Sequence, residues 1–472
     1  MKTKSTSRSA FFNPRVLIGF VLCSVGVLLA LAGLSKSVTE VSATTATAQT
    51  PDAVLRFEVN STEDAVDAQI GDGVCATATG VCTLRAAIQE ANAIPGAAAI
   101  SLPIGTYMLT IPGANEDTAQ TGDLDITDDL TIVGSGESQT IIDAAEGFRD
   151  RVFHIFSGTV VEMSALSIQH GAAVCCVGGG GIYNEGALSL RLVGLRFNSS
   201  GSVGGGLYNV GSAKLVSVVV HGNHSFVYDG GIRNEGQLEF DGGSISYNSS
   251  CGTGGLANHA IATLTDVTVS NNTSCGDTGG VWSLGTLILN RVTFSGNTSQ
   301  TYGGAITVLG PRAIMKDVTI IGNSAGTGGG LWNQGDSTLI NVTIDQNGAA
   351  SGGNIWNQGT VALYNTIVAN SVSGDNCVGT ITSGGHNLDS GSTCQLDQEG
   401  DLSNIDPLLG ELANNGGRTQ TQALLSGSPA IDAGSSTFFP PIDQRGVQRP
   451  ADGDGDGIAI SDIGAYEYVT GP

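Results

Sequence analysis

Three charged residues recur at one position of a repeated segment and could act together as an acid–base set. Asp266, Arg291 and Asp317 each lie six residues before a recurring asparagine. Equivalent positions of a stacked repeat form a column, so two carboxylates would flank one guanidinium. Such a set could hold Ca²⁺ against an acidic sugar and supply a base. The interpretation that we prefer is that alternating charges on adjacent turns neutralise one another.

A second column carries aromatic residues. In each repeat an aliphatic residue marks the register, and the position directly after it forms this column. All three tryptophans of the chain occupy that position. Exposed aromatic rings on one face suit sugar rings or partner surfaces, whereas rings that only stack on one another would stabilise the coil. The column runs Tyr183, Tyr208, Arg233, Ala257, Trp282, Thr307, Trp332 and Trp356, and its aromatic members are the predicted ligand-binding residues.

An acidic loop near the C-terminus is the strongest candidate for a metal site. Asp452, Asp454 and Asp456 alternate with glycines, the arrangement by which calcium loops bring hard oxygen ligands around one ion. The carboxylate expected at the twelfth position is replaced by Ile463, and Asp462 is the nearest acid. We therefore predict structural Ca²⁺ at Asp452, Asp454, Asp456 and Asp462, with a solvated acidic turn as the alternative.

The cysteines predict disulfides, because export leaves eight of them. Cys251 and Cys275 lie one repeat apart, so stacking would bring their Cα atoms within disulfide range, although a stacked pair of free thiols is an alternative. Cys175 and Cys176 form either a vicinal bridge or free thiols. The predicted disulfide cysteines are Cys75, Cys82, Cys251, Cys275, Cys377 and Cys394.

These side chains must be positioned by a short repeat. A glycine-rich phrase of the type GGGIYNEG returns every 24 or 25 residues, and an asparagine follows each copy three residues after an apolar position. The apolar spacing alternates as in strands. One fixed register through eight copies indicates an all-β, right-handed parallel β-helix of roughly ten coils. The asparagines should tolerate left-handed turns and stack their amides: Asn198, Asn223, Asn248, Asn272, Asn297, Asn323, Asn347 and Asn370.

The ends of the chain differ from the repeat. Residues 1–48 combine early lysines and arginines, an uncharged run over 16–34 and an Ala46-Thr47-Ala48 motif, which together predict an export signal or an uncleaved membrane anchor. The segment 82–93 is the one convincing helix, with Thr83 as its N-cap. Because a β-helix leaves an apolar end and an open β edge, this helix is expected to cap it.

Both termini of the exported chain resemble known bacterial domains. The segment around CTLRAAIQEANA is similar to the CSLREA domain, although Ala86 replaces the glutamate of the family name. The C-terminal sequence from IDPLLGELANNGG to DIGAYEY resembles the choice-of-anchor Q domain, and the GGAI and FSGN tetrapeptides resemble polymorphic outer membrane protein repeats. We expect a CSLREA-like cap over 54–99, a β-helix over 100–373 and a C-terminal domain over 374–468.

These resemblances imply a bacterial, exported, surface-associated protein without established chemistry. The net charge of −24 argues against nucleic acid and anionic membrane surfaces as partners, leaving membrane contact to the N-terminal segment if it is uncleaved. We expect a non-catalytic β-helix protein acting in adhesion or envelope interaction, with a polysaccharide or a cell-surface protein as its partner. The alternative is a polysaccharide lyase or hydrolase that acts on acidic polysaccharides on the same scaffold.

Overall fold

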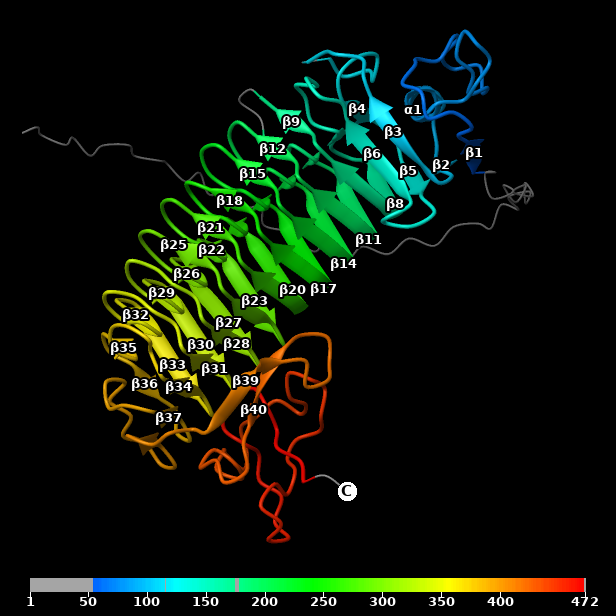
Figure 1. Cartoon of the computed structure of the whole chain (residues 1–472). Coiled ribbons are helices and arrows are strands. Elements are labelled where there is room, and N and C mark those ends of the chain that lie inside the picture. Colours follow the sequence, from blue (N-terminus) through cyan, green and yellow to red (C-terminus); the bar gives the residue numbers. More distant parts are fainter. Residues whose placement is uncertain (1–53, 115, 175–177, 471–472) are drawn as a thin grey trace, which may run out of the picture. The chain divides into compact units, whose positions relative to one another are not determined.

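A computed structural model describes residues 54–114, 116–174 and 178–470. Within this part the chain winds as a parallel β-helix, with each strand paired to its equivalents one coil before and one coil after (Figure 1). The pairing of Ile182 with Leu207, and of Leu207 with Ile232, is parallel and keeps the repeat register. The predicted all-β parallel solenoid is confirmed. Its third face has eleven strands, one from each coil, where the sequence predicted roughly ten coils.

The first face begins with β1, inside the segment expected to form the N-terminal cap. Five long strands start on the first face and continue round a bend into the second face: β8, β11, β14, β17 and β20. The first-face strands are β1 Leu55–Glu58, β2 Ala98–Ser101, β5 Leu130–Val133, β8 Val160–Gln169, β11 Ala187–Arg196, β14 Ser212–His221, β17 Gln237–Ser246, β20 Ile261–Ser270, β23 Thr286–Asn290, β27 Arg312–Lys316, β30 Asp336–Ile340, β33 Thr360–Tyr364 and β36 Thr382–Ser383.

The second face combines the distal halves of those five long strands with separate short strands. These are β3 Gly105–Leu109, β6 Thr140–Ala144, β24 Thr293–Ser295, β28 Thr319–Ile321, β31 Thr343–Asp345, β34 Ile367–Ala369, β37 Leu388–Asp389 and β38 Leu402–Ser403. Because β37 pairs in parallel with both β34 and β38, the ladder runs past residue 373, where the sequence placed the end of the β-helix.

The third face carries the column of aromatic residues, and a separate six-stranded sheet lines the corner before it. The third-face strands are β4 Leu124–Ile126, β7 Phe153–Ile155, β10 Ile182–Asn184, β13 Leu207–Asn209, β16 Ile232–Asn234, β19 Leu256–Asn258, β22 Val281–Ser283, β26 Ile306–Val308, β29 Leu331–Asn333, β32 Ile355–Asn357 and β35 Cys377–Val378. The corner strands are β9 Ala172–Ala173, β12 Ser199–Ser200, β15 His224–Ser225, β18 Ser249–Ser250, β21 Thr273–Ser274 and β25 Thr298–Ser299.

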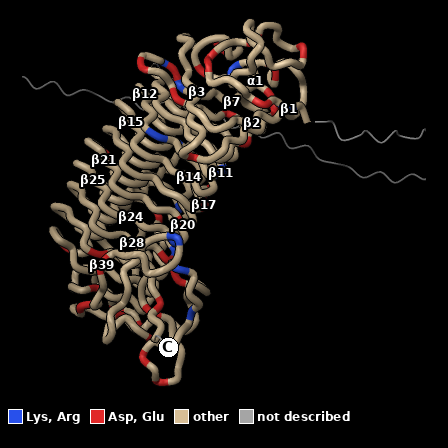
Figure 2. Tube along the Cα trace, turned by 45° about the vertical axis from the view of Figure 1, so that its right-hand side comes forward, with Lys and Arg blue, Asp and Glu red and all other residues tan. Residues whose placement is uncertain are grey.

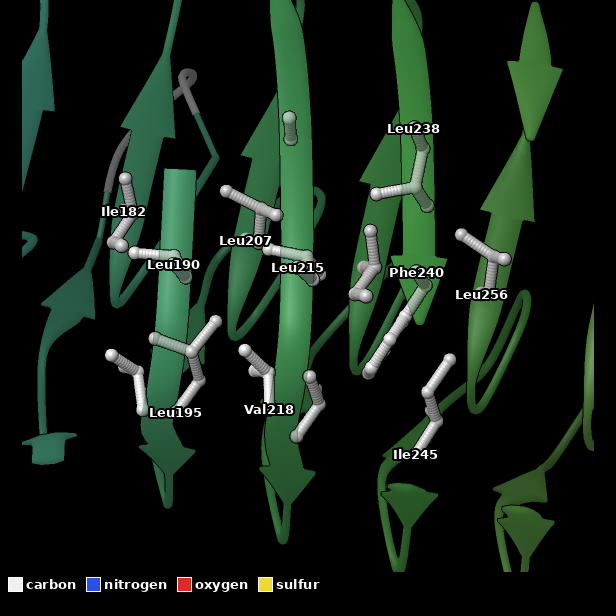
Figure 3. Packing of buried hydrophobic residues seen from close by; sticks show 14 of the residues in the cluster. Ile182, Leu190, Leu195, Leu207, Leu215, Val218, Leu238, Phe240, Ile245 and Leu256 are labelled. Carbon is white, nitrogen blue, oxygen red and sulfur yellow. The ribbon is translucent and has the colours of Figure 1, made fainter. Parts of the chain in front are cut away.

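The core is a stack of aliphatic side chains that all three faces direct inward. Leu190, Leu195 and Leu207 come from different faces and are fully buried, and Leu215 and Ile245 repeat the arrangement on the following coils (Figure 3). Each coil contributes only a thin layer of apolar surface, so its burial depends on the neighbouring coils. This explains why the apolar positions of the repeat are so regular.

Two bends per coil use left-handed backbone. The first bend, between the first and second faces, falls at Asp266, Arg291 and Asp317, whose φ angles are 56°, 55° and 53°. The second bend falls one residue before the recurring asparagine, as at Tyr247 with φ 56°. The prediction that the asparagines themselves adopt this conformation is wrong for most of the column, although Asn370 does so with φ 49°.

The asparagines instead form a buried ladder along the corner. The side chain of Asn248 accepts hydrogen bonds from the backbone N–H and the amide of Asn223, at 2.9 and 3.0 Å, and donates to the amide oxygen of Asn272 at 2.9 Å. The predicted rung-to-rung amide stacking is therefore confirmed. A second ladder, through Asn184 and Asn209, lies on the third face and was not anticipated.

The helix α1, Leu84–Ala93, matches the predicted segment, and the Thr83 side chain accepts a hydrogen bond from the Ala86 N–H at its N-terminus. Arg85 is 1% exposed. It forms an ion pair with Asp64 at 2.6 Å and donates to the backbone oxygens of Ala119 and Gly122. These contacts tie the helix to the loop that precedes β4.

After β38 the chain leaves the ladder and folds back against the second face (Figure 1, orange to red). It includes one antiparallel hairpin, β39 Leu409–Ala413 and β40 Thr421–Leu424. The Gln444 side chain accepts from the Thr319 hydroxyl at 2.7 Å, and Asn341 donates to the Asp462 backbone oxygen at 3.0 Å. The C-terminal segment therefore covers the late coils.

All three predicted disulfides are present. Cys251 and Cys275 join adjacent coils with their Cα atoms 4.4 Å apart, which excludes the stacked free-thiol pair. The other two bridges join Cys75 to Cys82 and Cys377 to Cys394. Disulfides are typical of proteins that fold in an oxidising, extracellular environment.

Several predictions concern residues outside the described part. The predicted export signal over residues 1–48 lies there, as does the pair Cys175 and Cys176. In residues 54–114, 116–174 and 178–470, no helix has the length and apolarity needed to span a membrane.

Candidate ligand groove on the third face

The aromatic column lies on the outer side of the third face. In β10, Ile182 and Asn184 point inward and are fully buried, so Tyr183 between them points outward. Tyr183 pairs in register with Tyr208, and their rings stack with centroids 5.1 Å apart. The predicted alignment of the column is therefore present, with its members on successive strands.

The two tryptophans at the end of the column mainly contact other rings. Trp332 and Trp356 stack with centroids 5.1 Å apart and an interplanar angle of 5°, and Tyr302 also packs against Trp332, with centroids 4.8 Å apart. Trp332 is only 6% exposed, so it has little ring surface available to a ligand. This part of the column matches the alternative in which stacked aromatics stabilise the coil.

Trp282 has a different environment, because it lines a groove of about 460 Å³. The preceding member of its column is Ala257, which pairs in register with both Arg233 and Trp282. Ala257 itself is 1% exposed and does not line the groove, whereas Arg233 and Trp282 on either side of it do. The groove is lined by Val203, Tyr228, Asp229, Arg233, Gly252, Thr253, His259, Asp277 and Trp282.

The loops that enter the third face from the corner form one wall of this groove. Tyr228 is 55% exposed on one of these loops, and Asp277 is exposed on another. The Cys251–Cys275 disulfide links the loop that contains Gly252 to the loop that contains Asp277. The wall is therefore covalently stiffened next to the groove.

The positive charge of the groove is already paired. Arg233 forms ion pairs with the buried Asp229 at 2.9 Å and with Glu235 at 2.8 Å. Burial raises the pKa of Asp229 to about 6, although Arg233 opposes the shift. The guanidinium is thereby fixed in place, and its charge is balanced by the two carboxylates.

Two further polar groups face the groove. The ring of His259 packs beside that of Trp282 with centroids 4.8 Å apart. Burial lowers the pKa of His259, which favours the neutral imidazole with one donor and one acceptor. Burial also raises the pKa of Asp277. One aromatic ring beside directional donors and acceptors is an arrangement that can bind a sugar ring.

The charged column of Asp266, Arg291 and Asp317 does not form one open site, as an enzyme would need. Arg291 donates to both carboxylate oxygens of Asp266, at 2.7 and 3.2 Å. Both residues line a groove of about 380 Å³ on the first face, which Arg418 of the C-terminal segment partly covers. The hydrogen bonds to Asp266 raise the pKa of Arg291, so it is a poor base.

Asp317 is separated from solvent by the C-terminal segment. It is 4% exposed and lies 3.4 Å from the guanidinium of Arg449. The structure therefore places Asp266 and Arg291 together in a groove and Asp317 in a buried position beside Arg449. The pair of Arg291 with Asp266 joins adjacent turns, as the neutralisation interpretation expects, whereas Asp317 faces Arg449 of the C-terminal segment, which that interpretation did not include.

The acidic C-terminal loop brings only part of the predicted calcium set together. Asp452 and Asp454 group with Asp432, which sequence reasoning missed, with potential ligand atoms within 4.8 Å of one another. Backbone N–H groups donate to these carboxylates, as from Gly453 to Asp432 and from Gly457 to Asp452. Asp462 accepts from the backbone of Asp432 and Tyr468.

Sequence reasoning also missed the loop residues of the groove. Tyr228, Asp229 and Asp277 belong to the irregular segment between the corner and the third face, where the repeat has no fixed side-chain pattern. Of the residues that line the groove, only Trp282 is among the predicted ligand-binding residues, through its place in the aromatic column.

Comparison with known proteins gives a single likeness. No family model and no curated protein matches the chain. Among solved structures, the crystal structure of pectate lyase Pel9A is similar, with 15% sequence identity and a TM-score of 0.35, covering 88% of this chain and 97% of that chain. At this identity and score, the likeness carries no argument about activity.

Proposed function

We propose that this chain is a non-catalytic, exported β-helix protein that binds a saccharide in the groove beside Trp282. The observation that supports it most is the groove of about 460 Å³ that Trp282 lines on the outer side of the third face. Trp282 would stack on the flat face of a sugar ring, while His259 and Asp277 would bond its hydroxyl groups.

A neutral sugar fits this groove better than an acidic one. Arg233 is already balanced by Asp229 and Glu235, so it has little charge left for a carboxylate ligand. The chain as a whole carries a net charge of −24, which repels polyanions. We therefore expect neutral hexose-containing oligosaccharides to bind, and polyuronates to bind more weakly.

The polysaccharide lyase alternative has less support from the geometry. A lyase needs an unprotonated group that can abstract a proton, and Arg291 is held protonated by its bidentate pair with Asp266. Asp317, the third member of that set, is buried against Arg449. No specific observation at these residues favours catalysis over charge neutralisation.

The proposed binding is tested with a panel of neutral and acidic oligosaccharides measured by isothermal titration calorimetry. Trp282→Ala should weaken binding of the best neutral ligand about tenfold or more, because stacking on one aromatic face contributes roughly 1.4 kcal/mol. Trp356→Ala is the matched control: Trp356 belongs to the same column but does not line the groove.

Two results would contradict the proposal. One is equal loss of affinity in both variants at equal thermal stability, which would place the ligand elsewhere on the column. The other is release of an unsaturated product from polyuronates, with the activity abolished by Arg291→Ala. That result would replace the binding function with the lyase function.

Two structural roles accompany this proposal. We propose that α1 covers the N-terminal end of the coil, supported by its buried contacts through Arg85, and that the loop over 452–457 binds structural Ca²⁺. The bonds from backbone N–H groups weaken the case for calcium, because they satisfy the carboxylates without an ion. A melting temperature that is unchanged by EDTA would contradict the calcium proposal.

A further inference from the structure

The aromatic column continues toward the N-terminus with residues of another kind. On β4 and β7 its members are Asp125 and His154, which pair in register with each other and then with Tyr183. Both precede the regular repeat, so the repeat pattern did not reveal them. A carboxylate and an imidazole thus lie side by side on the outer side of the third face.

One carboxylate oxygen at this position has no hydrogen-bond partner. Asp125 is fully buried, and its Oδ2 accepts from the Ala119 N–H at 3.0 Å, but its Oδ1 makes no hydrogen bond in the described part of the chain. An unpaired buried carboxylate oxygen is costly. Burial accordingly raises the pKa of Asp125.

A ring nitrogen of His154 lies close to that oxygen. Asp125 Oδ1 lies 3.5 Å from His154 Nδ1, and the two atoms form no hydrogen bond. Zinc bonds of 2.0–2.2 Å to nitrogen and oxygen give a tetrahedron with edges of about 3.4 Å. The observed separation therefore fits two ligands of one tetrahedral ion.

The other ring nitrogen of His154 is oriented by a carboxylate. Its Nε2 lies 3.2 Å from Glu185 Oε2, and the Tyr183 hydroxyl donates to Glu185 Oε1 at 3.0 Å. A histidine that donates Nε2–H to Glu185 turns the lone pair of Nδ1 toward Asp125. Metal-bound histidines usually donate their other ring N–H to a carboxylate, a backbone carbonyl or a water, and Glu185 would take this role here.

A third potential ligand, Asp117, comes from the loop before β4. A carboxylate oxygen of the exposed Asp117 completes a group with Asp125 and His154 in which the ligand atoms lie within 4.8 Å of one another. The nearby cation Arg151 pairs instead with Asp123 at 3.1 Å. The geometry points to a Zn²⁺ site formed by Asp117, Asp125 and His154, with Glu185 as the positioning residue and a fourth position open to solvent.

The site is tested by titrating the metal-free full chain with Zn²⁺ in a calorimeter, and with Co²⁺ as a spectroscopic substitute. We expect one Zn²⁺ per chain and the visible absorption of tetrahedral Co²⁺. His154→Asn and Asp125→Asn should each lower the affinity at least about 100-fold, and Glu185→Gln should lower it about 10- to 100-fold. His170→Asn is the matched control, because exposed His170 also contacts one carboxylate, that of Asp143, at 2.7 Å.

The outcomes separate this site from the alternatives. Zn²⁺ affinity that is equal in the wild type and His154→Asn, or lost equally in His170→Asn, would overturn the proposal. If His154→Asn fails to fold, unchanged affinity in folded Glu185→Gln would also overturn it. Trp282→Ala should leave Zn²⁺ binding unaffected, so failure of the zinc site and failure of saccharide binding are distinguishable.

Discussion

At the scale of single residues, the buried charges show how the C-terminal segment is held against the coils. Arg449 lies between Asp317, at 3.4 Å, and Glu467, at 3.1 Å, and donates to the backbone oxygen of Asp462. Burial raises the pKa of Asp317 and that of Asp462 to about 8 each. One guanidinium therefore faces more than one carboxyl group. The raised pKa values favour the protonated forms of Asp317 and Asp462 in the folded state near neutral pH.

This cluster predicts a pH dependence of stability. Because the folded pKa of Asp317 lies above its unfolded value, its stabilising contribution is fully present below about pH 4 and is lost as the pH rises through about 8. Asp317→Asn should reduce the slope of the unfolding free energy between pH 5 and 8, by up to about 1.4 kcal/mol per pH unit.

The measurement is denaturant unfolding across that pH range, followed by circular dichroism. Asp336→Asn, a change at an exposed carboxylate on the same run of coils, should leave the slope as it is in the wild type. An identical slope in Asp317→Asn and the wild type would show that Asp317 stays ionised in its pair with Arg449.

At the scale of elements, the asparagine ladder and the disulfides hold adjacent coils in register. Asn248 is fully buried and connects Asn223 to Asn272, while its amide also donates to the Val220 backbone oxygen at 3.0 Å. Its removal leaves donors and acceptors on both neighbouring coils without partners. The ladder is thus a buried polar column that runs along the corner from coil to coil.

Asn248→Ala should lower the free energy of unfolding by about 3 kcal/mol or more, because several buried polar groups lose their partners at once. The adjacent Tyr247→Ala is the control, since Tyr247 is 59% exposed and should cost less than about 1 kcal/mol. Chemical denaturation measures both. Equal effects of the two substitutions would contradict a structural role for the ladder.

The Cys251–Cys275 bridge should act on both stability and binding. Closing a loop over 24 residues stabilises a protein by about 3 kcal/mol, so Cys251→Ser with Cys275→Ser should lower the melting temperature. It should also weaken saccharide binding, because the bridge stiffens the groove wall. Cys377→Ser with Cys394→Ser should affect stability alone, since that bridge lies outside the groove. Equal saccharide affinity in both double variants would contradict the coupling.

The elements were predictable where the chain repeats, and less so elsewhere. The fixed spacing of Leu207 and Ile232 was sufficient to predict parallel stacking, and the one-repeat spacing of Cys251 and Cys275 to predict their disulfide. The groove was not predictable, because Tyr228 and Asp277 belong to loops whose conformation depends on packing. The burial of Asp317 was also missed, because its partner Arg449 is 132 residues away in the sequence.

At the scale of the whole described part, charge and chemistry are concentrated at particular regions of the coil. Acidic residues gather around the two ends, and the coils between them carry few charges (Figure 2). The proposed zinc site, the Tyr183–Tyr208 stack and the groove beside Trp282 follow one another along the third face. One outward column thus carries both proposed binding sites.

The central claim is that a sugar ring stacks on Trp282, and the intrinsic fluorescence of this residue tests it most directly. The chain has three tryptophans, so a Trp332→Phe, Trp356→Phe variant reports on Trp282 alone. We predict that a bound neutral oligosaccharide shifts its emission and protects it from quenching by acrylamide. A saccharide that binds this variant in calorimetry but changes neither the emission nor the quenching of Trp282 would contradict the account.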